Sequence, residues 1–149
     1  NISLNSHNLA TKLPFLEIGC GVGAQTPDLL ASLPDRSSVI GIDLDPAQVQ
    51  AAKVNLREKP ELAGRYSLTV ADATKLSFAN SSLSGAYVSW VLEHMPRVEA
   101  LKVLSELKRT VAPGGLIIFN EVHLDVHNSW IVQLPNSNEK VAPHCRRFI

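Results

Sequence analysis

The segment Phe15-Leu16-Glu17-Ile18-Gly19-Cys20-Gly21-Val22-Gly23 decides the fold of this chain. Four residues of strand type run directly into a loop with three glycines, and a helix is expected after them, with Pro27 tolerated in its first turn. Because glycine has no Cβ, the backbone of such a loop turns sharply and approaches a ligand closely. The segment therefore predicts a strand, a ligand-binding loop and a helix at the start of an α/β unit.

Outward from this loop, short apolar runs alternate with amphipathic stretches of helix length, which predicts βαβ units and a parallel sheet. The further strands are expected at 39–42, 66–71, 86–91 and 116–121, and the helices at about 26–33, 46–58 and 97–110. We expect Asp45 to cap the second helix in a capping box with Gln48. Leu101, Leu104 and Leu107 are expected to form the buried stripe of the third helix.

The composition is that of one globular domain. The chain has 149 residues, of which 45% are hydrophobic and 19% charged, a balance that supports a single core. Fourteen basic and fourteen acidic residues leave no net charge, so nucleic acid is not an expected partner. No apolar run is long enough to span a bilayer, and two cysteines supply neither a disulfide framework nor a zinc site. We expect a cytoplasmic protein. We expect no metal site, because His123 and His127 lack an evident third ligand.

Acidic residues mark the ends of the predicted strands. Four of the five strands end in or next to one, namely Asp43, Asp72, Glu93 and Glu121, and Glu17 lies inside the first strand. Ligands of an open parallel sheet bind outside the carboxyl ends of its strands, where a carboxylate after the second strand accepts ribose hydroxyls. The pattern predicts a nucleoside pocket. The loop from Gly19 to Ala24 also fits the dinucleotide form G-x-G-x-x-A, so the loop alone does not identify the nucleoside.

Five motifs follow one another between residues 15 and 121. They are LEIGCGVG (16–23), GIDLD (41–45), VADA (70–73), VLEHM (91–95) and VAPGG (111–115). As a set they resemble the motifs of the class I S-adenosylmethionine-dependent methyltransferases, including the ubiquinone and sterol methyltransferases. The resemblance implies an α/β fold, a Rossmann-like three-layer α/β/α sandwich with a mostly parallel sheet. It also implies S-adenosyl-L-methionine as cofactor, S-adenosyl-L-homocysteine as product and a small-molecule methyl acceptor.

The resemblance implies which residues hold the methionine and ribose parts of the cofactor. Gly19, Cys20 and Gly21 would line the methionine part, and Glu17 would bind its amino end directly or through water. Asp43 would accept hydrogen bonds from the ribose hydroxyls. On its residues alone, Cys20 is expected to be a small filler of the loop rather than a reactive thiol.

The remaining site residues are expected around the adenine and the methyl group. The resemblance implies that Leu44 packs on one adenine face, that Asp72 accepts from the exocyclic amine and that the Ala73 N–H donates to a ring nitrogen. Trp90 would offer its backbone carbonyl near the sulfonium. His94 follows the fourth strand and titrates near neutrality, so it is the first candidate for a general base if the acceptor must lose a proton. Asp72 as a turn former and His94 as a helix-entry residue stay open as alternatives.

Two other functions stay open on the residues. They are an NAD(P)-dependent Rossmann oxidoreductase and a non-catalytic S-adenosylmethionine-binding regulatory subunit. The family's sheet has seven strands, whereas five are readable here, and residues 122–149 are few for a helix and an antiparallel pair of ordinary lengths. We therefore expect one domain over 1–149 with its core at 15–121. Its N- and C-terminal elements are expected to be partly lacking, with the last antiparallel pair short or missing.

Overall fold

The computed structural model describes residues 12–123, 126–134 and 144–148. Seven strands form one sheet in the order β3-β2-β1-β4-β5-β6-β7. The strands are β1 Phe15–Ile18, β2 Val39–Asp43, β3 Tyr66–Val70, β4 Leu83–Ser89, β5 Val111–His123, β6 Val126–Gln133 and β7 His144–Phe148, and the helices are α1 Thr26–Ser32, α2 Pro46–Arg57 and α3 Arg97–Thr110, with short 3₁₀ turns η2 at Pro60–Leu62 and η3 at Leu92–His94. The predicted α/β fold class is confirmed.

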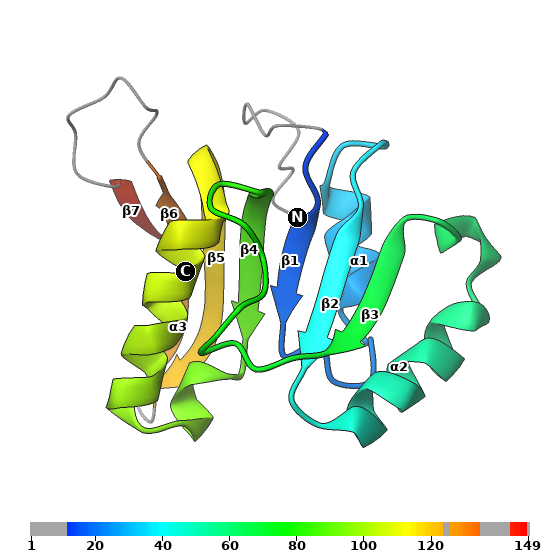
Figure 1. Cartoon of the computed structure of the whole chain (residues 1–149), viewed down its shortest axis with the longest axis horizontal. Helices are drawn as coiled ribbons and strands as arrows, with labels where there is room; N and C mark the ends of the chain where they lie inside the picture. The colour runs from blue at the N-terminus through cyan, green and yellow to red at the C-terminus, as the bar shows by residue number, and fades with distance from the viewer. Residues whose placement is uncertain (1–11, 124–125, 135–143, 149) are drawn as a thin grey trace.

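The strand order reverses at β1, which pairs in parallel with β2 on one side and β4 on the other. The chain runs outward from β1 through β2 to β3, then returns to β4 and continues to β5, all in parallel. The loops that leave β1 and β4 therefore diverge and open a crevice at the carboxyl ends of the strands. These ends point to the lower edge of the molecule in Figure 1.

Helices cover both faces of the sheet in three layers (Figure 1). One buried cluster joins Phe15 and Val39 of the sheet to the leucines of α1 and to Leu56 of α2. The second cluster joins Leu16 and Ile42 to the inner side of α3, on the opposite face. Phe15 and Leu16 of β1 thus belong to different cores, because successive side chains of a strand point to opposite faces of the sheet.

The final antiparallel pair is present. β6 pairs with β5 over eight residue pairs and β7 with β6 over five, both antiparallel. The expectation that this pair is short or missing is wrong for β6. β5 continues beyond Glu121 to His123, and only residues 124–125 separate it from β6. A short hairpin joins antiparallel strands without the helical crossover that a parallel strand requires.

The buried stripe of α3 differs from the prediction. Val103, Leu107 and Thr110 are fully or almost fully buried, whereas Leu101 is 55% and Leu104 38% exposed. The predicted series advances by three residues at each step, so it drifts around a 3.6-residue helix by roughly 60° each time. The observed series combines steps of four and three residues and stays on one side. Within the described residues, no helix has the length and apolar character needed to cross a membrane.

Two leucines of α3 test this assignment. We expect Leu107→Ala to lower the free energy of unfolding by about 2–5 kcal/mol, because it leaves a cavity between α3 and the sheet. Leu104→Ala removes the same atoms from a partly exposed position, and we expect it to cost about 1 kcal/mol or less. Urea unfolding followed by circular dichroism measures both. Equal losses for the two variants would contradict the assignment of the buried face.

Candidate cofactor site

The glycine loop 19–23 is tied to the end of β2. All three of its glycines have positive φ, and the N–H groups of Gly19 and Cys20 both donate to the carbonyl of Ile42, at 2.9 and 3.0 Å. A Cβ on Gly19 would overlap the side chain of Val91. Glycine is therefore required at position 19 both by its backbone conformation and by the close approach of the loop that follows β4.

Asp43 joins the glycine loop to the start of α2. Its Oδ2 accepts from the Gly21 N–H at 2.9 Å, and its Oδ1 accepts from the Asp45 N–H at 3.0 Å. A carboxylate oxygen accepts more than one hydrogen bond, so each oxygen retains capacity for a ligand hydroxyl. Asp43 is thus held in place before any ligand binds.

The cap of α2 differs from a capping box. The Asp45 side chain accepts from the Ala47 N–H at 2.8 Å, as expected of an N-cap. In a capping box the Asp45 N–H would donate to the side chain of Gln48. Here it donates to the Asp43 carboxylate instead. Gln48 instead lines the cavity next to the glycine loop.

Asp72 forms a tight turn after β3. Its Oδ1 accepts from the hydroxyl of Thr74 at 2.7 Å and from the Thr74 N–H at 2.9 Å, and Lys75 Nζ lies 3.4 Å from Oδ2. The bonds from Thr74, followed by the charge of Lys75, hold the pKa of Asp72 below its usual value. Asp72 is therefore the turn former that the sequence left open, and it also lines the cavity as a carboxylate.

Glu121 is a site residue that the motifs missed. Its carboxylate accepts from the N–H groups of Val91, Leu92 and Glu93 at 3.1–3.4 Å. Burial raises the pKa of Glu121, although these backbone bonds oppose the rise. Glu121 lies outside all five motifs, and in the sequence only its position at the end of the predicted strand 116–121 pointed to it. The backbone groups that it contacts depend on the register of β4 and β5.

Eight of the ten expected site residues line one cavity of about 600 Å³. Those that line it are Gly19, Gly21, Asp43, Leu44, Asp72, Ala73, Trp90 and His94. Cys20 lines an adjoining cavity of about 400 Å³, which shares Gly19, Gly21 and Trp90 with the first. Glu17 is the one expected residue that lines neither cavity.

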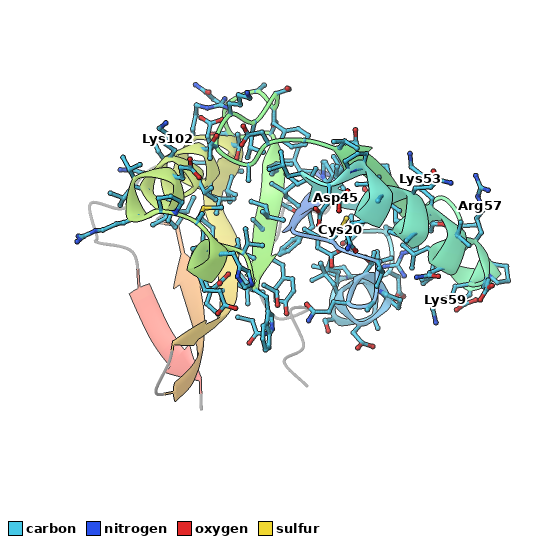
Figure 2. All side chains as sticks on the ribbon, turned by 90° about the horizontal axis from the view of Figure 1, so that it is seen from below. Cys20, Asp45, Lys53, Arg57, Lys59 and Lys102 are labelled. Carbon is cyan, nitrogen blue, oxygen red and sulfur yellow. The ribbon has the colours of Figure 1, made fainter. Side chains whose placement is uncertain are left out.

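The described lining of these cavities contains carboxylates but no lysine or arginine. Figure 2 looks onto this edge of the sheet, with Cys20 and Asp45 marking the glycine loop and the start of α2. The labelled basic side chains of α2, Lys53 and Arg57, extend outward away from the sheet. A site of this charge favours a cationic ligand over a phosphate.

The Cys20 thiol is buried within the glycine loop, whereas the side chains of His123 and His127 are outside the described part of the structure. Burial raises the pKa of the Cys20 thiol to about 12, and the carboxylates of Glu17 and Asp43 add to the rise. The thiol stays protonated at neutral pH, which agrees with a filler role. His123 and His127 lie on the paired strands β5 and β6, while Asp125 between them is outside the described residues. Within the described part of the chain, no three potential ligands gather as a metal site.

Fold and site together define an α/β protein with a cavity at the switch point of its parallel sheet, the place where such sheets bind their ligands. Residues 16–119 match the family described as "Methyltransferase domain", and the chain belongs to this family. The match favours the methyltransferases over the dinucleotide-dependent oxidoreductases that the glycine loop left open.

Curated relatives are longer than this chain. It is 31% identical over 108 residues to a demethylmenaquinone methyltransferase of Lactococcus lactis, which covers 72% of this chain and 41% of that protein. It is 34% identical over 103 residues to a chloroplastic tocopherol O-methyltransferase of Arabidopsis thaliana, covering 69% of this chain and 28% of that protein. The chain spans less than half the length of these relatives.

Solved structures share the fold. The [4+2]-cyclase SpnF superposes with a TM-score of 0.65 at 25% identity, over 73% of this chain and 38% of that one. A geranyl diphosphate C-methyltransferase of Streptomyces coelicolor, solved with S-adenosyl-L-homocysteine, also gives a TM-score of 0.65, at 17% identity over 80% of this chain and 43% of that one. At that identity the second likeness shows the fold alone.

Glu17 makes the stability of the unliganded chain depend on pH. Its carboxyl is 2% exposed and accepts from the Thr26 hydroxyl at 2.7 Å, and burial raises its pKa from 4.5 to about 7. The folded state therefore binds this proton more tightly than the unfolded state does. The protonated carboxyl therefore contributes fully to the free energy of unfolding below pH 4.5, and this contribution is lost as the pH rises through 7. The loss is about 3 kcal/mol, because each unit of difference in pKa corresponds to about 1.4 kcal/mol.

Glu17→Gln stays neutral at every pH, so we expect it to remove this loss. Urea unfolding of both proteins at pH 5, 7 and 8.5 measures the difference in unfolding free energy. Glu61→Gln makes the same change at an exposed position and is expected to follow the parent protein. A parallel pH dependence for the parent and Glu17→Gln would show that Glu17 is not the group responsible.

Proposed function

We propose that this chain binds S-adenosyl-L-methionine in the 600 Å³ cavity and takes part in transfer of its methyl group to a small molecule. The observation that carries the proposal is the arrangement of Asp43. This carboxylate is on the last residue of β2, accepts a hydrogen bond from the Gly21 N–H, and lines the same cavity as Asp72 and Ala73. A nucleoside whose ribose faces Asp43 has its base on the side of Asp72 and its 5′ substituent on the side of the glycine loop.

The charge and shape of the cavity suit this cofactor. S-adenosyl-L-methionine has a sulfonium and an ammonium group and no phosphate, and the described lining carries carboxylates without a lysine or arginine. Leu44 is 72% exposed at the rim, where an apolar side chain gains by covering an adenine face. Gly19, Cys20 and Gly21 are proposed to line the methionine part, with Glu17 behind them acting on its amino end through water.

The bound cofactor supplies an electrophilic methyl group whose displacement leaves a neutral thioether. The protein's task is then to align the acceptor with that methyl group. Trp90 lines both cavities, and its backbone carbonyl is proposed to lie near the sulfonium. His94 lines the larger cavity and its Nε2 lies 3.3 Å from Glu93 Oε1. We propose His94 as general base for acceptors that lose a proton.

A small-molecule acceptor is supported by the names of relatives, which include demethylmenaquinone, tocopherol and 24-methylenesterol. The cyclase among the similar structures shows that this fold also serves a different reaction. Binding of the cofactor is therefore the first property to measure, and transfer of a labelled methyl group by the pure protein then separates an enzyme from a regulatory subunit.

Asp43 and Asp45 form a matched pair for the binding test. We expect Asp43→Ala to weaken binding of S-adenosyl-L-homocysteine by at least about 100-fold, because two ribose hydroxyls lose a charged acceptor and each such bond contributes about 1.5–3 kcal/mol. Asp45→Ala removes the cap of α2 and is expected to lower stability by about 0.5–2 kcal/mol. Its affinity for the ligand is expected to stay within about threefold of the parent protein.

Titration calorimetry on the folded proteins measures these affinities. Lack of binding to the parent protein would reject the proposal. A thermal shift with NAD and none with S-adenosyl-L-homocysteine would replace it by the oxidoreductase reading.

A further inference from the structure

The loop that follows β4 contains an unusual backbone conformation. Trp90 has φ +58, in the left-handed region that a bulky side chain rarely adopts. Its side chain is half-exposed and its residue lines both cavities. A strained backbone at such a place persists only where its surroundings hold it. The question is which group in the structure does so.

The chain turns from the left-handed Trp90 into the right-handed residues that begin η3, and the N–H groups there converge. Val91 follows with φ −117 and ψ −53, in the right-handed region. A left-handed residue next to a right-handed one turns successive N–H groups toward a common point, which forms a concave anion-binding site in the main chain. In this chain, the point is occupied by the carboxylate of Glu121, which accepts from Val91, Leu92 and Glu93.

The loop held in this way also contacts the glycine loop. The side chain of Val91 fills the space that a Cβ on Gly19 would need. The Trp90 N–H donates to the carbonyl of Asn120 at 3.1 Å, next to Glu121 on β5. Residues 90–95, which form one wall of the cavity, are therefore hydrogen-bonded to β5 and packed against the glycine loop.

We propose that Glu121 is a positioning residue, which holds the wall from Trp90 to Met95 in the shape that receives the cofactor's sulfur end and the methyl acceptor. It acts through the main chain and lines neither cavity itself. The assignment of this wall to the sulfur end rests on the proposed function. The hold of Glu121 on Trp90 does not, and it is measurable without any ligand.

Glu121→Gln keeps the shape of the side chain but replaces one acceptor oxygen by an amide NH₂. This group is a donor and cannot accept from the main-chain N–H groups that it faces. The chain has two tryptophans, Trp90 and Trp130, so a Trp130→Phe background leaves Trp90 as the only indole fluorophore. In that background, we expect Glu121→Gln to increase acrylamide quenching of Trp90 and shift its emission. Glu61→Gln, the same change at an exposed site, is expected to alter neither.

Stability separates this role from a general structural one. Glycine adopts positive φ without strain, so a Trp90→Gly background should depend less on Glu121. We expect Glu121→Gln to lower the thermal midpoint, measured by circular dichroism, by less in Trp90→Gly than in the parent chain. Equal losses in both backgrounds, or unchanged Trp90 quenching in Glu121→Gln, would overturn the proposal.

Ligand binding then tests the link to the site. In protein that calorimetry and circular dichroism show to be folded, we expect Glu121→Gln to weaken S-adenosyl-L-homocysteine binding about tenfold, because a wall that is no longer held must be ordered when the ligand binds. Parent-like affinity would remove the proposed link between this wall and the cofactor. If the parent protein does not bind the ligand, the proposed function fails, while the fluorescence and stability measurements still decide whether Glu121 holds Trp90.

Discussion

The attachment of the glycine loop to the end of β2 is the constraint on which the site depends. One carbonyl, that of Ile42, receives two successive N–H groups of the loop, and the neighbouring carboxylate of Asp43 receives a third. These bonds need the positive φ values that glycine permits. They hold the chain that follows β1 against the end of β2, beside the cavity at the switch point.

The opposite side of the crevice is built by the same physical means. There, the main chain after β4 turns through the left-handed Trp90, and its N–H groups meet the carboxylate of Glu121. In both places a carboxylate in the last residues of a strand satisfies main-chain donors that would otherwise need water. The parallel register of β1, β2, β4 and β5 sets the distance between the two walls, so the sheet defines the size of the cavity.

Local patterns predicted most of this fold, because the signals that define its elements are short in sequence. β1 was predicted with its observed bounds, and Pro46 and Asp45 marked the start of α2. The errors have a common origin in contacts between distant residues. The buried side of α3 is chosen by the sheet beneath it, and β6 forms because the hydrogen-bonding edge of β5 accepts an antiparallel partner. The sequence of α3 has apolar residues on more than one side of the helix, and the sequence of β6 does not specify its partner strand.

The site shows the same division. Residues that face the cavity lie in motifs of fixed spacing, so their positions were predictable, whereas Glu17 and Glu121 act inward. Glu17 is buried against Thr26, and Glu121 holds the loop of a neighbouring strand. A carboxylate buried in this way favours its protonated form, and only main-chain or hydroxyl donors offset the cost of its charge. Glu17 belongs to a motif and Glu121 ends a predicted strand, but only the three-dimensional structure shows that both carboxylates lie outside the lining of the cavities.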